Sequence, residues 1–360
     1  MSRMIFGDLH IIALYRTGVI DMESSRQGKQ SFLFLQPPAI AAYASVVGKK
    51  EAQGPLKSSF DIASEDTAFG EKTWEKAETQ MQKTAMRLAL QKADWKEEEL
   101  DAAFVGDLLN QCIGSSFSMR NNRVPTFGLY GACSTMAEGL ILAGMAVSGG
   151  YCRKTLTMAS SHFASSERQY RFPLGYGGQR TPTAQWTVTG AGAVLLSQHG
   201  KGPYLRAATV GTIVDRGIKD ANNMGAAMAP AAFETLRAHF DDMGLAPEDY
   251  DLIVTGDLGA LGSQLVRELF EKVGVKLGSR YSDCGVMIFD TEKQDVHCGG
   301  SGCGCSASVL CGHLLGQMER RQLNRLLFCG TGALLSPLST QQGESIPAVC
   351  HVVAIHSERS

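Results

Sequence analysis

The chain has 360 residues, of which 44% are apolar, and its formal net charge is −2. It is long enough to bury a large core, and the absence of a basic stripe argues against nucleic acid as a partner. No stretch reaches about 18 consecutive apolar residues, so we expect no membrane-spanning helix. Ten cysteines at irregular spacing favour a reducing compartment over a disulfide framework.

The first predicted segment is an N-terminal extension over residues 1–21. It holds a short apolar run with charged side chains around it and lacks the cleavage site of a signal peptide. We expect this extension to pack poorly, as chain ends often do, and assign it no function.

A helix is predicted over residues 74–90, because apolar side chains recur there at three- and four-residue steps. The opposite face carries Glu and Lys residues, so one side of this helix should face water. The apolar positions are Trp74, Ala77, Met81, Ala85 and Leu88.

The chain then contains two similar stretches, at residues 88–111 and 239–263. Each reads as a helix end, an acidic turn, a short apolar strand and the residues Gly-Asp-Leu, and each is followed by a Gly/Cys/Ser-rich loop and a helix of small residues. An internal repeat of this kind predicts two similar halves. We place them at 22–200 and 201–360, joined near 197–205. Strands that alternate with helical patterns predict an α/β fold with parallel sheets.

The loop "GACST" places Cys133 at the start of the helix 136–147, which is apolar on nearly all sides and therefore expected to be buried. Thr135 and Glu138 suggest a capping box at its start, and Gly149 with Gly150 suggests its end. A cysteine at a helix N-terminus feels the positive end of the helix dipole, which favours the thiolate. Cys133 is therefore a candidate nucleophile, and the alternative is a small packed core residue.

These features resemble the thiolase fold, and within it the ketoacyl-synthase-III type enzymes. A more specific resemblance, over roughly residues 28–356, is to the stage V sporulation protein AD family. It is carried by "YGACST", "SSHFASSERQYRFPLGYGGQRTPTAQWTVTGAGAV", "MGAAMAPAA", "GGSGCGCSA" and "GTGALLSP". The resemblance implies a thiolase-like fold of two duplicated halves in αβαβα layers, with family members starting near Met22.

The same resemblance implies a role. The family acts in spore formers as a soluble, peripheral partner of the membrane proteins of a stage V sporulation channel in the forespore and spore inner membrane. That channel moves dipicolinate during sporulation and germination, and the resemblance implies that this protein binds dipicolinate itself, as the free acid or its calcium chelate. A homodimer and no cofactor are also implied.

An acyl-transferring cysteine needs a base and groups that hold an oxyanion. In the ketoacyl-synthase-III type enzymes these come from the second half, as His with Asn. Here Asp257 occupies the region of the His loop, and Cys303 lies near the expected Asn. A carboxylate beside Cys133 would raise the pKa of its thiol. We therefore expect a binding pocket without condensing activity. Two alternatives stay open: an acyltransferase that uses Cys133, and a scaffold with a vestigial pocket.

A site for a flat aromatic dianion needs donors for two carboxylates and a wall for the ring. The N–H groups of the loop at Cys133 could supply one donor set. His162 follows a strand, at the end where α/β folds place their sites. Arg168 and Arg171 can grip carboxylates, and Tyr170 can stack on the ring.

Each of these residues also has a structural interpretation. His162 could be a hydrogen-bonded core residue, and the arginines could be surface residues that pair with Glu167. Asp107 and Asn110, in "GDLLN", could hydrogen-bond the cysteine loop or cap the next turn.

The segment 297–313 gathers two His and four Cys residues, which are metal-ligand types. It lacks a paired C-x2-C knuckle, and its Cys-x-Cys is flanked by Gly and Ser. We predict that these cysteines pack in a buried helix and that no metal is bound.

Overall fold

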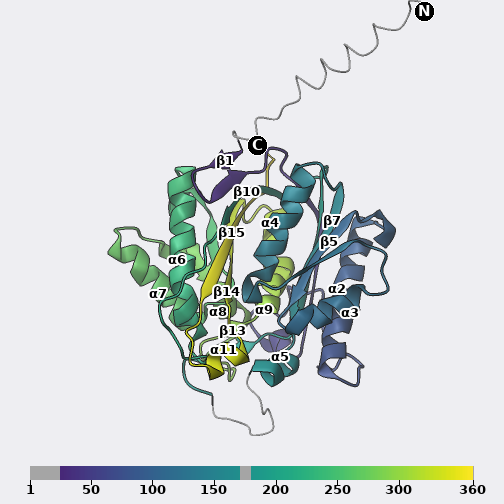
Figure 1. The fold of residues 1–360 in the computed structure, drawn as a ribbon. Helices are drawn as coiled ribbons and strands as arrows, with labels where there is room; N and C mark the ends of the chain where they lie inside the picture. Colours follow the sequence, from purple (N-terminus) through teal and green to yellow (C-terminus); the bar gives the residue numbers. More distant parts are fainter. Residues whose placement is uncertain (1–24, 171–179, 360) are drawn as a thin grey trace, which may run out of the picture.

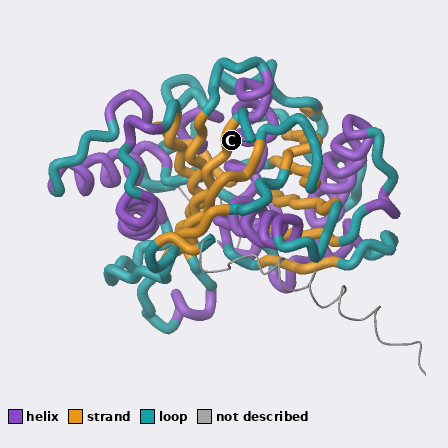
Figure 2. The backbone as a smooth tube through the Cα atoms, turned by 90° about the horizontal axis from the view of Figure 1, so that it is seen from above, coloured by secondary structure: helices purple, strands orange, loops and turns teal. Residues whose placement is uncertain are grey.

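The structure is a computed structural model that describes residues 25–170 and 180–359. Two of the predictions, the extension over 1–21 and the role of Arg171, lie outside these residues. The described chain forms two mixed sheets with helices between them and on both outer sides (Figures 1 and 2).

The first half of the chain builds a sheet with the strand order β3–β9–β7–β5–β6. Strands β5, β6 and β7 are parallel, and β9 runs antiparallel to both of its neighbours. The bounds are β3 (Ala39–Val47), β5 (Ala102–Asp107), β6 (Thr126–Leu129), β7 (Lys154–Ser161) and β9 (Gly190–Ser197).

The second half repeats this pattern in the order β10–β15–β14–β11–β12. Again three strands are parallel, and β15 runs antiparallel to both of its neighbours. The two sheets meet where Tyr204 of β10 pairs with Ala39 of β3. The bounds are β10 (Tyr204–Val210), β11 (Leu252–Thr255), β12 (Tyr281–Asp283), β14 (Arg325–Ala333) and β15 (Ala348–His356).

Short strands extend this framework. The hairpin of β1 and β2 adds to β10 of the second half, β4 adds to β3, and β8 pairs with β13 in a separate ribbon. The bounds are β1 (Arg26–Gln27), β2 (Ser31–Leu33), β4 (Ile62–Ala63), β8 (Trp186–Thr187) and β13 (Gly300–Ser301).

Helices complete five layers. Between the sheets lie α4 and α9, of which α9 runs through a π-helical turn (Leu310–Leu314) into α10. α2 and α3 cover the outer face of the first sheet, and α6 and α7 that of the second (Figure 1). The predicted layered fold is confirmed. The bounds are α2 (Trp74–Ala93), α3 (Ile113–Met119), α4 (Thr135–Ser148), α5 (Phe163–Tyr170), α6 (Met224–Met243), α7 (Gly259–Lys272), α8 (Cys284–Ile288), α9 (Cys303–Val309), α10 (Leu315–Glu319) and α11 (Pro337–Gln341).

The predicted helix over 74–90 is α2. It begins after Thr73, whose side-chain oxygen accepts a hydrogen bond from the Lys76 N–H, and it ends at Asp94 in the left-handed conformation. Its buried positions, among them Ala77, Met81 and Ala85, face the first sheet as the spacing predicted.

The predicted central helix is α4, and it is buried nearly throughout. It ends at Gly149, as expected, but the predicted capping box at its start is wrong. The Thr135 hydroxyl donates to the Ala132 carbonyl instead of capping a helix N–H, and one carboxylate oxygen of Glu138 is buried without a partner. The chain enters α4 through a short 3-10 turn (Ala132–Ser134), which moves the helix start away from the capping-box register.

Small residues let the central helices approach the strands closely. A methyl group at Gly192 of β9 would lie 2.3 Å from the Ala307 carbonyl oxygen, and one at Gly304 would lie 2.4 Å from that of Gly190. The cysteines Cys303, Cys305 and Cys311 are buried in this layer. They act there as small apolar side chains, and their packing in a buried helix is as predicted. The prediction is wrong for Cys298, which lies in a turn before α9 and is only partly buried.

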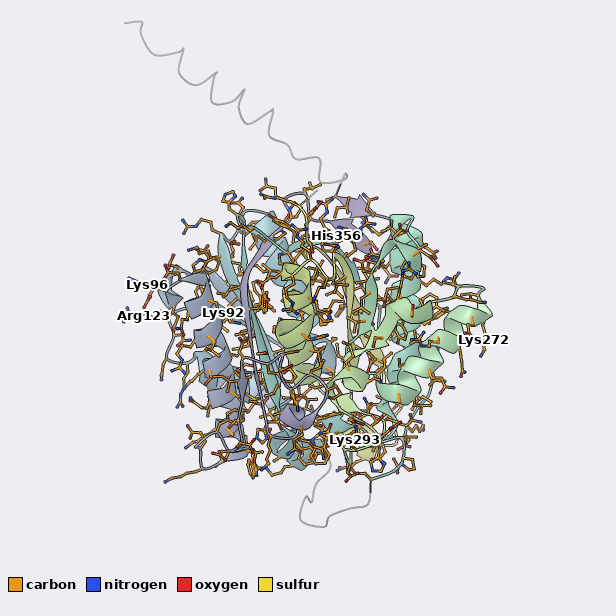
Figure 3. The ribbon with its side chains drawn as sticks, turned by 180° about the vertical axis from the view of Figure 1, so that it is seen from behind. Lys92, Lys96, Arg123, Lys272, Lys293 and His356 are labelled. Atoms are coloured by element: carbon orange, nitrogen blue, oxygen red, sulfur yellow. The ribbon has the colours of Figure 1, made fainter. Side chains whose placement is uncertain are left out.

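No helix in the described ranges is long and apolar enough to cross a membrane. The labelled basic side chains are spread over the surface: Lys92, Lys96 and Arg123 lie on the side of α2, Lys272 on the side of α7, and Lys293 at the lower end (Figure 3).

Candidate functional site

Cys133 lies at the turn that connects β6 to α4, between the two sheets. It is 6% exposed. The preceding residue, Ala132, has a φ of 51°, a left-handed conformation that non-glycine residues rarely adopt and that is common at functional sites. The Ser134 hydroxyl donates to the Gly131 carbonyl oxygen at 2.7 Å and helps to hold this turn.

Asp257, which follows β11, reaches Cys133 from the second half. Its carboxylate accepts hydrogen bonds from the Thr331 hydroxyl at 2.8 Å and the Gly302 N–H at 2.9 Å. It lies close enough to the Cys133 thiol for each group to shift the pKa of the other. The side chain is fully buried, and burial raises the pKa of Asp257 to about 6.

Cys303, the first residue of α9, also lies beside Cys133. Its thiol donates to the Ser160 carbonyl oxygen at 2.9 Å, and burial raises its pKa well above the ordinary value. Gly302 before it has a φ of 97°, and a methyl group there would lie 2.6 Å from the Ser161 hydroxyl oxygen. A glycine is therefore needed at this turn.

The structure thus brings Cys133, Asp257 and Cys303 together, one from the first half and two from the second. Burial raises the pKa of the Cys133 thiol well above its ordinary value, and the charges of Asp257 and then of Cys303 raise it further. The neutral thiol is therefore the form present near neutral pH. The expected effect of a carboxylate on this cysteine is confirmed.

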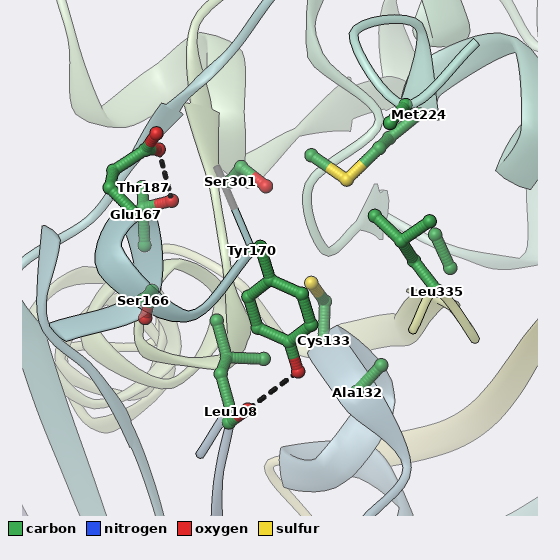
Figure 4. Close-up of a pocket in the computed structure, with 12 residues that line it drawn as sticks. Leu108, Ala132, Cys133, Ser166, Glu167, Tyr170, Thr187, Met224, Ser301 and Leu335 are labelled. Atoms are coloured by element: carbon green, nitrogen blue, oxygen red, sulfur yellow. Dashed lines mark hydrogen bonds between the residues drawn. The ribbon is translucent and has the colours of Figure 1, made fainter. Parts of the chain in front are cut away.

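A small cavity opens above Cys133 (Figure 4). Its volume is about 60 Å³, which is room for roughly two water molecules. Its walls combine aliphatic side chains with the ring of Tyr170 and three hydroxyl groups. The lining residues are Leu108, Ala132, Cys133, Ser166, Glu167, Tyr170, Thr187, Ala221, Met224, Ser301, Ala333 and Leu335.

The polar groups of the cavity differ in how they are satisfied. The Tyr170 hydroxyl donates to the Leu108 carbonyl oxygen at 2.6 Å, and Thr187 hydrogen-bonds to Glu167 at 3.3 Å (Figure 4). The hydroxyl oxygen of Ser166 is buried and has no hydrogen-bond partner. Because a buried hydroxyl without a partner is costly, Ser166 is a group that a bound molecule could satisfy.

Asp107 and Asn110 lie behind the cavity and outside its lining. The carboxylate of Asp107 accepts hydrogen bonds from the Leu109 N–H at 2.8 Å and from both the N–H and the hydroxyl of Ser115. Asn110 is at the surface, where its side-chain oxygen accepts from Tyr130 at 3.2 Å.

His162 is separated from the cavity lining. Its Nε2 lies 2.8 Å from the Thr67 carbonyl oxygen, its Nδ1 accepts from the Ala164 N–H at 3.2 Å, and its ring stacks on Trp74. Both ring nitrogens are therefore engaged, and burial lowers the pKa of this histidine. Arg168 forms an ion pair with Glu75 at the surface, and Arg171 lies outside the described residues.

Sequence reasoning missed the hydroxyl groups of the cavity and its apolar wall, which includes Met224 and Leu335. One signal was present: Ser166 lies four residues before Tyr170, so a helix places both on one face. Thr187, Ser301 and Met224 come from three distant segments, and only the fold brings them together. No group of three metal-ligating side chains occurs in the described part of the chain.

Comparison with solved structures identifies the fold. Synthase III for 3-oxoacyl-[acyl-carrier-protein] from Aquifex aeolicus superimposes with a TM-score of 0.53 at 12% identity, over 89% of this chain and 99% of that one. A variant of OleA from Xanthomonas campestris superimposes with a TM-score of 0.57 at 15% identity, over 90% of this chain and 99% of that one. Another variant of OleA, with bound lauric acid and lauroyl-CoA, superimposes with a TM-score of 0.54 at 14% identity, over 89% of this chain and 99% of that one.

Comparison with sequences identifies the family. The family model for stage V sporulation protein AD matches residues 28–356. The protein of that name from Bacillus subtilis (strain 168) is 42% identical over 326 residues, which cover 91% of this chain and 96% of that protein. With a thiolase-like fold and a match over nearly its full length, the chain belongs to the stage V sporulation protein AD family of sporulation proteins.

Proposed function

We propose that this protein binds dipicolinate in the cavity above Cys133 and carries out no acyl transfer. The observation that carries the proposal is the pairing of Cys133 with Asp257. The position of a nucleophile is kept, but its neighbour is a carboxylate that disfavours the thiolate. A pocket that persists with an inactive cysteine is better suited to binding than to catalysis.

The described lining can supply several contacts to such a ligand. Tyr170 offers an aromatic face, and the hydroxyl groups of Ser166, Thr187 and Ser301 can donate to carboxylate oxygens or to a pyridine nitrogen. The turn at Ala132 adds N–H groups at the start of a helix. Pockets that hold small-molecule ligands have volumes of about 300 Å³ or more, so binding in this smaller cavity requires the flexible Met224 side chain and its neighbours to move outward.

The carboxyl group of Glu167 offers the cavity an oxygen ligand for the calcium ion of a dipicolinate chelate. The described lining contains no Lys or Arg, and it contains the carboxyl group of Glu167. Free dipicolinate carries two negative charges, and its calcium chelate is neutral. Calcium prefers oxygen ligands, which the carboxyl and hydroxyl groups of this cavity provide.

Isothermal calorimetry of the full chain with dipicolinate tests the proposal. We expect saturable binding whose affinity is higher with calcium and lower in the Cys133→Ala variant. Phthalate keeps both carboxylates but lacks the pyridine nitrogen, so it should bind more weakly. Failure of dipicolinate to bind, with or without calcium, would contradict the proposal, as would equal binding of phthalate.

Mass spectrometry tests the absence of acyl transfer. After incubation with acyl-CoA donors, we expect no acyl group on Cys133, because the thiol is neutral and Asp257 stands where the condensing enzymes have their histidine. A stoichiometric adduct would instead establish an acyltransferase of the ketoacyl-synthase-III type.

We further propose that the protein acts at the forespore and spore inner membrane as a peripheral partner of the membrane proteins of the dipicolinate channel. Support comes from membership of a sporulation family. Pull-down of those membrane proteins from sporulating cells tests the association. If cells that carry a pocket variant unable to bind dipicolinate still take up dipicolinate normally, the protein acts as a scaffold for the channel.

A further inference from the structure

Trp186 lies on the other side of the strand that lines the Cys133 cavity. In β8, neighbouring side chains point to opposite faces, so Thr187 faces the cavity and Trp186 points away from it. Phe163 stacks on the Trp186 ring with 3.8 Å between ring centroids. The Nζ of Lys50 lies 3.7 Å from the same ring centre, and the guanidinium carbon of Arg180 lies 4.7 Å from it.

Two positively charged side chains therefore lie at the same ring. Burial lowers the pKa of Lys50, and the charge of Arg180 lowers it further. Arg180 pairs through Nη2 with Asp295, at 2.6 Å from its carboxylate oxygen. The other terminal nitrogen, Nη1, is buried and has no hydrogen-bond partner. No ion pair of Lys50 is present in the described ranges.

Two acidic groups lie near Lys50, and one oxygen of Glu51, Oε2, is buried without a hydrogen-bond partner. Glu51 is fully buried, one of its oxygens accepts from the Thr189 N–H at 3.0 Å, and burial raises its pKa to about 7. Asp295 is the counter-ion of Arg180 and also lies 3.3 Å from His297. Asp295 and Glu51 favour the charge of Lys50 from a distance, but neither forms an ion pair with it.

A second lysine–tryptophan pair in the molecule shows what a balanced arrangement looks like. The Nζ of Lys154 lies 4.4 Å from the ring centre of Trp95, and it forms an ion pair with Glu99 at 2.5 Å. At Trp186 the place of that carboxylate is taken by the guanidinium group of Arg180.

We propose that a small carboxylate binds at Trp186, between the Nζ of Lys50 and the Nη1 of Arg180. Each of the two carboxylate oxygens accepts a hydrogen bond from one of the cations. The ligand thereby supplies the hydrogen-bond partner that Nη1 lacks and the ion-pair partner that Lys50 lacks. Because Nη1 is buried, the ligand is a small molecule rather than a side chain of a folded partner. This site is separate from the Cys133 cavity and does not depend on the function proposed above.

Tryptophan fluorescence of the full chain reports this site. Titration with succinate should give a saturable change, and sodium chloride at matched ionic strength should not. Lys50→Gln should weaken the apparent affinity by about tenfold or more, because a charged hydrogen bond is lost. Lys50→Arg should restore most of it, and Lys154→Gln, the matched control at Trp95, should bind like the wild type.

Equal curves for the wild type and for Lys50→Gln would overturn the proposal. So would a response to succinate no greater than that to chloride, or saturation by inorganic phosphate but not by succinate. Circular dichroism of Lys50→Gln establishes that the variant is folded. Dipicolinate binding that survives in Lys50→Gln belongs to the Cys133 cavity, so the two proposals can fail independently.

Discussion

The Cys133 thiol and the Asp257 carboxyl share a buried volume, and each affects the protonation of the other. The carboxylate disfavours the thiolate, and the neighbouring thiol favours the ionised form of the carboxyl group. The dipole of α4 acts in the opposite direction, and burial with a full negative charge nearby outweighs it. Burial and, after it, the side chain at 257 therefore lower the reactivity of the cysteine.

Replacement of this carboxylate should activate the thiol. Asp257→Asn keeps the shape of the side chain and removes the charge, so the pKa of Cys133 should fall towards its ordinary value. Alkylation of Cys133 by iodoacetamide, followed by mass spectrometry at fixed pH, should then be about tenfold faster. The half-buried Cys152 in the same samples is the internal control. An unchanged rate at Cys133 would show that Asp257 does not control the thiol.

At the residue scale, the sequence predicted those parts of the site that lie next to recognisable motifs. Cys133 lies in a Gly-Ala-Cys-Ser loop of the first half. In the second half, Asp257 lies in the repeated Gly-Asp-Leu stretch and Cys303 in the Gly/Cys/Ser-rich loop that follows it. The hydroxyl of Ser166 could not be predicted as unsatisfied, because that property depends on every neighbour in three dimensions. The engagement of both nitrogens of His162 by the backbone was likewise invisible in the sequence.

At the element scale, a buried polar network ties α2 to the first sheet. Glu78 accepts hydrogen bonds from Ser160 at 2.8 Å and Ser165 at 2.9 Å, and Gln82 bridges Ser160 and Ser115. Burial raises the pKa of Glu78 to about 8, and the charge of Asp107 contributes. Helix periodicity predicted α2, but the expectation that its Glu and Lys residues face water is wrong for Glu78, because Glu78 and Gln82 are both fully buried.

This network predicts a pH dependence of stability. The pKa of Glu78 is higher in the folded than in the unfolded chain, so its contribution is fully present below about pH 4.5 and is lost as the pH rises through about 8. Glu78→Gln removes this dependence. Between about pH 5 and pH 8, the variant should gain more than about 1 kcal/mol in free energy of unfolding relative to the wild type. Urea titrations at both pH values measure it.

The exposed variant Glu65→Gln is the control for that experiment, and it should show no such gain. A parallel pH dependence in the wild type and in Glu78→Gln would mean that Glu78 ionises normally in the fold.

Strand β6 leaves an open edge at one end of the first sheet. Three of its four residues are exposed, and the Phe127 side chain is 57% exposed while its ring stacks on Phe104. An exposed strand edge offers unpaired N–H and C=O groups, and two copies related by a twofold axis can pair such edges antiparallel. We therefore expect a homodimer formed through β6.

Light scattering after size exclusion tests this prediction. The wild type should have twice the mass of one chain, and Thr126→Pro, which removes an N–H donor and stiffens the edge, should shift it to the monomer. Tyr151→Lys, on a side chain that is 88% exposed elsewhere, should leave the dimer intact. A monomeric wild type, or a dimeric Thr126→Pro variant, would contradict pairing through β6.

At the scale of the whole molecule, the duplication was readable because both halves bury the same kind of strand before the same Gly-Asp-Leu turn. The structure shows the consequence: two sheets with the same strand order face each other across α4 and α9. The pairing of residues 31–33 with β10 of the second half was not predictable, since this short strand has no repeat partner. The site lies where the two halves meet, so neither half contains it alone.

The most direct test of the account is calorimetric titration of calcium dipicolinate into two matched variants, Ser166→Ala and Ser308→Ala. Both remove a buried hydroxyl that has no partner, so neither should lower the melting temperature. Only Ser166 lines the cavity above Cys133. The account predicts that Ser166→Ala weakens binding by about tenfold and that Ser308→Ala binds like the wild type. Equal affinity of the two variants would contradict the placement of the ligand in this cavity.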